Sequence, residues 1–198
     1  MGSDGQRVDR LLVGVCGAAA ILSLPSYLAT LRAELAAEIQ VIMTSAACSM
    51  IPPSTVALLC DGVFVDEGPA PQKGEGHVGL AGWCDLFVVL PATANVLGQA
   101  ANGIAPNLLA TAVLASPRPV VFCPNANDGM WTKNAVRRNV ETLRSDGHIV
   151  VEPELAPAYE VDTGETRQTW VVPEPDRLVE RLREVLRRPE FRSLRSGE

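Results

Sequence analysis

The stretch LLVGVCGAAA at residues 11–20 decides the fold of this chain. Residues 11–15 form a short apolar run, which is typical of a strand buried on both faces of a sheet. The small residues at 16–20 then predict a tight turn. Apolar residues at helical spacing follow over 25–37, and a second apolar run fills 39–43. The chain therefore opens β-α-β, which predicts a parallel sheet with a right-handed crossover.

The rest of the chain continues this alternation of strands and helices. The sequence predicts further strands at 86–90, 119–123 and 148–151, and helices at 54–59, 77–84, 94–101, 107–114, 134–145 and 177–187. It also predicts a loop at 66–76, a mobile segment without a strong period at 152–175, and a frayed tail at 189–198. We therefore predict an α/β protein of one domain over 1–198, with its core at 10–188. Its doubly wound, Rossmann-like (flavodoxin-like) parallel sheet would carry helices on both faces.

Composition and charge narrow the classes of function. The 198 residues suit one domain with a sizeable core, and a net charge of -6 without a basic run gives no reason to expect nucleic acid or an anionic membrane as partner. The five scattered cysteines lack CxxC spacing, which indicates reduced thiols and neither disulfides nor a metal site. The polar start and the short apolar runs predict a cytoplasmic protein.

Three predicted strands end in unusual small or polar residues. Gly17-Ala18-Ala19 follow the first strand, PATAN at 91–95 ends the third, and PNANDGMW at 124–131 follows the fourth. Ligands of doubly wound sheets bind beyond the carboxyl ends of the strands, so these segments predict a ligand site. The small residues would let a phosphate approach backbone N–H groups, although they would equally permit tight helix–sheet packing. Thr93 could likewise contact a ligand or simply cap the next helix.

The second strand helps to define the ligand. It ends in Thr44-Ser45, where a dinucleotide site would place an acidic residue, and the GxGxxG fingerprint is absent. Both features favour a mononucleotide over NAD. The GxSxG elbow of serine hydrolases and the GxxxxGK[ST] loop are also missing.

Two histidines are the candidate general bases. Histidine is the side chain whose ordinary pKa lies nearest neutrality, and the chain has His77 and His148. His77 follows a glycine-rich loop and precedes a predicted helix, whereas His148 lies between a turn and a strand. A structural role stays open for each, and position alone does not choose between them.

These motifs together resemble one family, the homo-oligomeric flavin-containing cysteine decarboxylases. The family includes phosphopantothenoylcysteine decarboxylases of coenzyme A synthesis and peptidyl-cysteine decarboxylases of lantibiotic pathways, of the epidermin-maturing kind. Its PASANT motif reads PATANV at 91–96, its PxMNxxMW motif reads PNANDGMW at 124–131, and NGIAPNLL at 102–109 is similar to its NGxxxNLL stretch. The family's active-site histidine falls on His77, upstream of Trp83-Cys84-Asp85. The resemblance runs from about residue 11 to 172.

The resemblance implies a cofactor, a set of site residues and an assembly. It implies FMN rather than FAD, bound by Gly17, Ala18, Ala19, Thr44, Ser45, Ala46, Thr93, Ala94, Asn95 and Asn125. It implies that His77 and Asn127 are catalytic, with Asn127 on the substrate carboxylate. Met130, Trp131 and Gly164 would contact the substrate, Gly164 from a mobile clamp at 155–172. The assembly would be a trimer-based homo-oligomer, up to a dodecamer, with the flavin at a subunit contact.

Departures from the family pattern refine the expected function. Thr93 keeps the hydroxyl of the usual Ser, Val96 loses that of a Thr, and Ala126 removes the bulk of a Met beside Asn127. The coenzyme A branch has a reducing cysteine in its clamp, and residues 155–172 contain none.

We therefore expect oxidative decarboxylation of the C-terminal cysteine of a ribosomally made precursor peptide. The product would be an aminoenethiol(ate) for aminovinyl-cysteine formation, in concert with other peptide-modifying enzymes. Two alternatives stay open, a phosphopantothenoylcysteine decarboxylase and a non-catalytic flavin-binding regulatory subunit.

Overall fold

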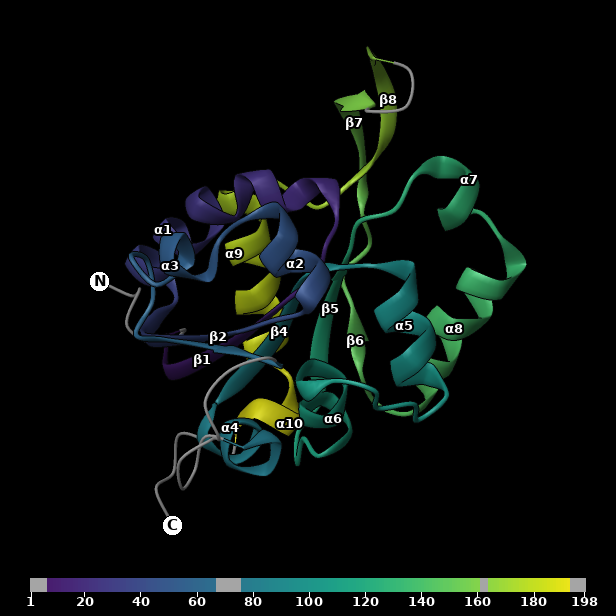
Figure 1. Cartoon of the computed structure of the whole chain (residues 1–198). Coiled ribbons are helices and arrows are strands. Elements are labelled where there is room, and N and C mark those ends of the chain that lie inside the picture. The colour runs from purple at the N-terminus through teal and green to yellow at the C-terminus, as the bar shows by residue number, and fades with distance from the viewer. Residues whose placement is uncertain (1–6, 67–75, 161–163, 193–198) are drawn as a thin grey trace.

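A parallel sheet of six strands forms the centre of the molecule (Figure 1). The computed structural model describes residues 7–66, 76–160 and 164–192. The strands are β1 (Val8–Val15), β2 (Ala36–Met43), β3 (Gly62–Val65), β4 (Leu86–Ala92), β5 (Val120–Pro124) and β6 (Ile149–Val150). They lie in the order β3-β2-β1-β4-β5-β6, which is typical of Rossmann-like folds. The first three strands extend the sheet to one side and the last three to the other, so the strand order reverses between β1 and β4. The predicted doubly wound α/β fold is confirmed.

Helices cover both faces of this sheet. In chain order they are η2 (Ala19–Ser23), α1 (Leu24–Glu34), α2 (Ser45–Met50), α3 (Pro53–Val56), α4 (His77–Trp83), α5 (Ala94–Ala101), α6 (Leu108–Leu114), α7 (Asp128–Trp131), α8 (Asn134–Ser145), α9 (Pro175–Leu186) and α10 (Pro189–Arg192). Leu28 of α1 and Leu182 of α9 join the buried cluster on one face. Leu97 of α5 and Leu143 of α8 join the cluster on the other. The central strands are buried on both sides, which explains their continuous apolar runs.

An antiparallel hairpin projects from this body (Figure 1). It consists of β7 (Glu154–Glu160) and β8 (Glu165–Val171), and residues 161–163 of its turn lie outside the described part of the chain. The prediction of an aperiodic segment at 152–175 is therefore wrong in its secondary structure. Most of the hairpin is exposed, so it lacks the alternation of buried and polar residues that reveals a strand. Its mobility stays a prediction.

Other boundaries differ from the predicted ones. The helix predicted to reach residue 37 ends at Glu34, because the residues from Ala36 onward pair with β1. The frayed tail is wrong for residues 189–192, which form α10 and bury the Phe191 side chain in the core. The loop predicted at 66–76 falls almost entirely outside the described residues, as does the tail beyond 192. Within the described residues, no helix combines the length and apolar character needed to cross a bilayer.

Candidate active site

The ends of four strands meet at one edge of the sheet, on both sides of the point where the strand order reverses. Three backbone hydrogen bonds join their loops: Thr44 N to Val15 O (3.0 Å), Cys16 N to Pro91 O (3.3 Å) and Asn125 N to Ala92 O (2.9 Å). The structure thus brings together the segments 17–19, 44–46, 93–95 and Asn125 that the sequence analysis assigned to a cofactor. This edge is where the fold class places its ligands, and it is called the cofactor edge below.

Gly17 and Ala46 allow two of these loops to touch. A Cβ atom at Gly17 would lie 2.8 Å from the Cβ of Ala46 and 3.0 Å from its carbonyl atoms, which is closer than real Cβ contacts. The loop after β1 can therefore reach the start of α2 only because residue 17 has no side chain. The small residues serve tight packing here, and they also keep the backbone accessible to a ligand.

Two threonines cap the helices that begin at this edge. The Oγ1 atoms of Thr44 and Thr93 accept hydrogen bonds from Ala47 N and Val96 N, both at 3.3 Å. Thr93 is thus a helix cap, one of the two roles that its sequence position allowed. A cap satisfies one of the free N–H groups of a helix start, and the others remain able to donate to an anionic ligand.

Asn125 links the end of β5 to η2. Its Oδ1 accepts a hydrogen bond from Ala20 N at 3.2 Å, and its amide NH2 can still donate to a ligand. Nearby, burial raises the pKa of the Cys16 thiol to about 11. Cys16 is therefore a neutral packing residue at neutral pH and no nucleophile.

The loop after β5 carries the residues assigned to the substrate. Asn127 is exposed, and its Oδ1 accepts a hydrogen bond from Met130 N at 2.9 Å, which fixes its amide at the start of α7. Met130 is exposed beside it, whereas Trp131 is buried in the core, with the Arg137 guanidinium 5.2 Å from its ring centroid. Trp131 therefore anchors this loop to the hydrophobic core.

His77 lies apart from these residues within one chain. It is exposed at the first residue of α4, which packs against α6 and β1. Figure 1 shows α4 on the opposite side of the molecule from α7 and the hairpin. No hydrogen bond within the described residues joins His77 to the loops at the cofactor edge. A single chain does not bring His77 and Asn127 together.

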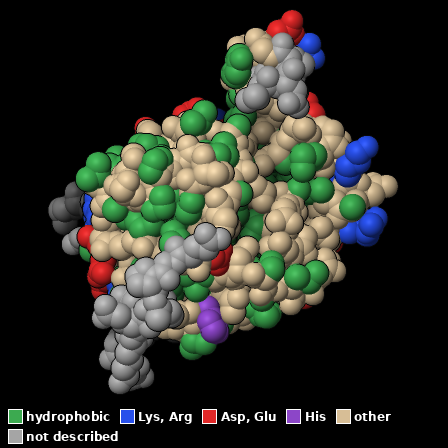
Figure 2. All heavy atoms as spheres, viewed as in Figure 1, with side chains coloured by type: hydrophobic (Ala, Val, Ile, Leu, Met, Phe, Trp, Pro, Cys, Tyr) green, Lys and Arg blue, Asp and Glu red, His purple; other side chains and the backbone are tan. Residues whose placement is uncertain are grey.

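Apolar side chains are exposed on the segments that follow β1 and β2. Leu22 of η2 is 75% exposed, Leu58 just after α3 is 83% exposed, and Met50 ends α2. Figure 2 shows apolar side chains gathered on the face that carries α2 and α3. Adjacent exposed apolar residues are typical of surfaces that meet another protein.

Comparison with known proteins identifies the family. The family model described as Flavoprotein matches residues 3–184. This chain belongs to the flavoprotein family. Mersacidin decarboxylase of Bacillus sp. (strain HIL-Y85/54728) is 44% identical to this flavoprotein over 168 residues, which cover 85% of this chain and 86% of that protein.

Two solved structures are similar to this flavoprotein over most of its length. The structure of MrsD from Bacillus sp. HIL-Y85/54728 has a TM-score of 0.77 at 39% identity and covers 89% of this chain and 95% of MrsD. The FMN-dependent cysteine decarboxylase SpaF has a TM-score of 0.73 at 35% identity and covers 89% of this chain and 96% of SpaF. The recognised family resemblance is confirmed.

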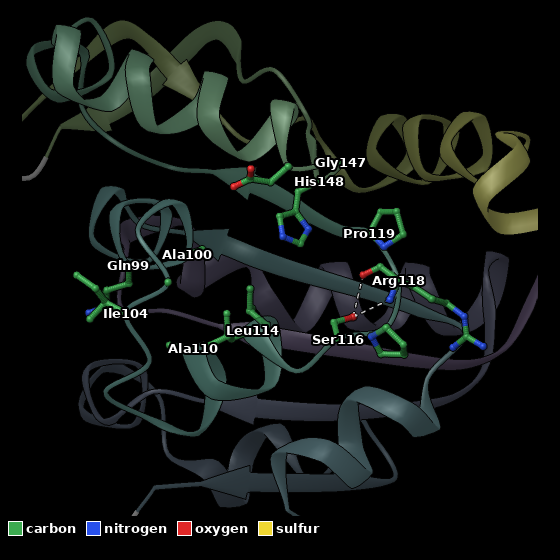
Figure 3. Close-up of a pocket in the computed structure, with 14 residues that line it drawn as sticks. Gln99, Ala100, Ile104, Ala110, Leu114, Ser116, Arg118, Pro119, Gly147 and His148 are labelled. Atoms are coloured by element: carbon green, nitrogen blue, oxygen red, sulfur yellow. Dashed lines mark hydrogen bonds between the residues drawn. The ribbon is translucent and has the colours of Figure 1, made fainter.

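The second histidine of this flavoprotein, His148, lines a pocket at the other end of the sheet (Figure 3). The pocket has a volume of about 360 Å³ and is lined by Gln99, Ile104, Leu114, Ser116 and His148, among others. The Nδ1 atom of His148 accepts a hydrogen bond from Val120 N at 3.1 Å, where β5 begins. Burial lowers its pKa, and its ring lies edge-on to Phe122. This pocket contains none of the assigned site residues, and His148 has a structural role.

The described residues contain no group of three or more His, Cys, Asp or Glu side chains that could hold a metal ion. Cys16, Cys60, Cys84 and Cys123 are free thiols. Gly164, assigned to the substrate clamp, lies in the hairpin with a φ of 70°, a conformation that favours glycine.

Proposed function

We propose that this flavoprotein is an FMN-dependent peptidyl-cysteine decarboxylase that acts on the C-terminal cysteine of a ribosomally made precursor peptide. One observation carries the proposal. The cofactor edge and the Asn127 loop are adjacent in the structure, in a chain that is 44% identical to mersacidin decarboxylase over most of both lengths. The product would be an aminoenethiol(ate) for aminovinyl-cysteine formation in lantibiotic-type pathways.

The residues of the cofactor edge fit FMN. Gly17 and Ala46 form a close floor without side chains that would fill the site, and the capped starts of α2 and α5 offer backbone N–H donors to a phosphate. The amide of Asn125 can donate to the flavin ring. Bound FMN would supply a hydride acceptor for the cysteine Cβ, and a thioaldehyde on the substrate would then be the electron sink for loss of CO2.

Asn127 would hold the substrate carboxylate. Its Oδ1 is engaged by Met130 N, so the NH2 end of the amide is directed toward a ligand and cannot easily exchange places with the oxygen. Two N–H donors would fix the carboxylate before CO2 departs. Ala126 leaves space beside this amide, and exposed Met130 offers an apolar contact to the cysteine side chain.

His77 would take the proton from the substrate Sγ atom, and we propose that it does so from a neighbouring subunit. Within one chain α4 lies far from α7, whereas the exposed Leu22, Met50 and Leu58 offer a contact surface beside the cofactor edge. A trimer-based homo-oligomer, up to a dodecamer, with the flavin at a subunit contact would complete the site.

We also propose a cytoplasmic place for the reaction, beside other peptide-modifying enzymes. The free thiols of Cys16, Cys60, Cys84 and Cys123 suit a reducing compartment. An enethiol product is a nucleophile that can add to a dehydroamino acid in the same peptide, which another enzyme must supply.

The direct test is incubation of the purified holoprotein with a synthetic peptide that ends in cysteine. Loss of CO2 and two hydrogen atoms, about 46 Da, is expected by mass spectrometry. The same peptide as its C-terminal amide should stay unchanged, because it has no carboxylate to lose. Turnover of phosphopantothenoylcysteine alone would favour the coenzyme A alternative. Bound flavin without turnover of either substrate would favour the regulatory subunit, and both results contradict the proposal.

A His77→Asn variant tests the assigned base. It should keep the yellow colour of bound flavin and lose turnover, because asparagine cannot accept the thiol proton at neutral pH. Flavin absorbance per protein and the rate of mass loss are measured on the same sample. A variant that turns over at the wild-type rate would show that His77 is not the base.

A further inference from the structure

The hairpin is tied to the substrate loop through one carboxylate. The Oδ1 atom of Asp128 accepts a hydrogen bond from the Thr169 hydroxyl at 3.1 Å and a second from Trp170 N at 3.3 Å. Asp128 is the first residue of α7 and follows Asn127 directly. The side chain that would bind the substrate carboxylate and the side chain that binds the hairpin are therefore consecutive in sequence.

These bonds lie next to the anchored base of the hairpin, at the second and third of its seven paired positions. At the base, Glu154 pairs with Arg177 of α9 at 3.0 Å, and Tyr27 donates to the Pro173 carbonyl at 2.9 Å. Above the base, the Asp128 contacts fix β8 against α7. Since Trp170 N donates to Asp128, that N–H points away from β7, and α7 covers this part of the outer edge of β8.

The register of the hairpin gives it an apolar face. Leu155 is paired with Trp170, and Tyr159 with Thr166, so these side chains share one face of the two strands. Leu155 is 57% exposed and Tyr159 is 65% exposed, so both keep apolar surface that the other described residues leave open. A peptide whose C-terminal carboxylate sits on Asn127 would pass this face with the residues that precede its cysteine.

We propose that Asp128 is a positioning residue that, with Thr169, sets the hairpin at a fixed distance from Asn127, so that the Leu155/Tyr159 face binds apolar side chains upstream of the terminal cysteine. The proposal rests on the peptidyl-cysteine decarboxylase function proposed above. Asp128 touches neither the cofactor nor the reacting atoms. Its effect falls on the binding of longer peptides and leaves the chemical step alone.

The size of the effect follows from the exposure of the contact. Hydrogen bonds to a carboxylate are worth more than neutral ones, but these are solvent-exposed. We expect Asp128→Ala to raise KM for a pentapeptide about three- to tenfold with kcat little changed. Thr169→Val should raise it less, because the bond from Trp170 N remains. Asp128→Asn keeps an acceptor oxygen and should restore most of the affinity.

The experiment compares a pentapeptide that has apolar residues before its terminal cysteine with an N-acetylated dipeptide that is too short to reach the hairpin. Asp128→Ala and Thr169→Val should raise KM for the pentapeptide only. Thr142→Val is the matched control, because Thr142 is exposed on α8, lies outside the hairpin and makes no side-chain hydrogen bond within the described residues. Hydrogen exchange should show faster exchange of the Trp170 amide in Asp128→Ala.

The outcomes separate this inference from the proposed function. A wild-type protein without turnover overturns the function itself. If the wild type is active, the positioning role is overturned by either of two results. One is that Asp128→Ala and Thr169→Val keep the wild-type KM, and the other is that they change KM equally for both peptides. If Asp128→Ala fails to fold, Thr169→Val decides, because it leaves α7 intact.

Discussion

At the scale of single residues, the cofactor edge is built from small side chains. Gly17, Ala46 and the capping threonines contribute space and backbone donors, and no charged side chain stands among the ten assigned cofactor residues. Such a site is compatible with a chain of net charge -6, because backbone N–H groups bind an anion whatever the overall charge. Substituting the smallest of these residues should therefore be costly.

Gly17→Ala should lower both flavin content and stability. The new Cβ would lie 2.8 Å from the Cβ of Ala46, so the loop after β1 must move, and overpacking of this kind costs about 1–3 kcal/mol. Flavin absorbance per protein and the free energy of unfolding by denaturant measure the two effects. The matched control is Gly82→Ala in α4, where nothing lies within 4 Å of the new Cβ and little change is expected. A Gly17→Ala protein with full flavin and stability would contradict the close contact.

At the scale of elements, burial decided what the sequence could predict. The strands around Val13 and Val88 are buried on both faces, and their apolar runs identified them. The hairpin was missed because its stability comes from backbone pairing of largely exposed residues, which leaves no periodic signal. The role of Asp128 was missed for a related reason, since Thr169 and Trp170, which bond to it, are about forty residues away.

His148 links the starts of β5 and β6 and should make stability depend on pH. Burial lowers its folded pKa below the ordinary 6.5, so the unfolded chain binds the proton more readily. The stability contributed by neutral His148 is complete above pH 6.5 and is lost as the pH falls from there toward the folded pKa. Unfolding by denaturant across this range, for wild type and His148→Gln, measures the difference. An identical slope in both proteins would contradict the buried neutral histidine.

At the scale of the whole molecule, the sequence assigned His77 and Asn127 to one site, and the single chain separates them. The motifs predicted segments that the structure does bring together, because strand ends meet at a known edge of the fold, and their binding of a cofactor stays a prediction. The position of α4 relative to α7 depends on packing between elements that are distant in the sequence. The Asn127 that His77 would face belongs to a second copy of the chain, so the motifs of one chain do not reveal it. The proposed subunit contact resolves the separation.

Mixing two inactive variants tests this arrangement. His77→Asn and Asn127→Ala should each lack turnover, since each removes one half of every site. If neighbouring subunits supply the two residues, co-expression in equal amounts restores about a quarter of the wild-type activity, because one site in four then receives both intact side chains. The two variants carry different affinity tags, and their co-purification verifies that mixed oligomers form. Mixed oligomers without activity would show that one chain supplies both residues.

The proposed reaction oxidises and decarboxylates a peptide's terminal cysteine with the protein's own flavin. An anaerobic single-turnover reaction with a peptide that ends in cysteine tests this most directly, with product followed by mass spectrometry and flavin by absorbance. The account predicts one decarboxylated peptide for each flavin bleached, and no bleaching with the C-terminal amide. Decarboxylation without bleaching, or bleaching without loss of CO2, would contradict it.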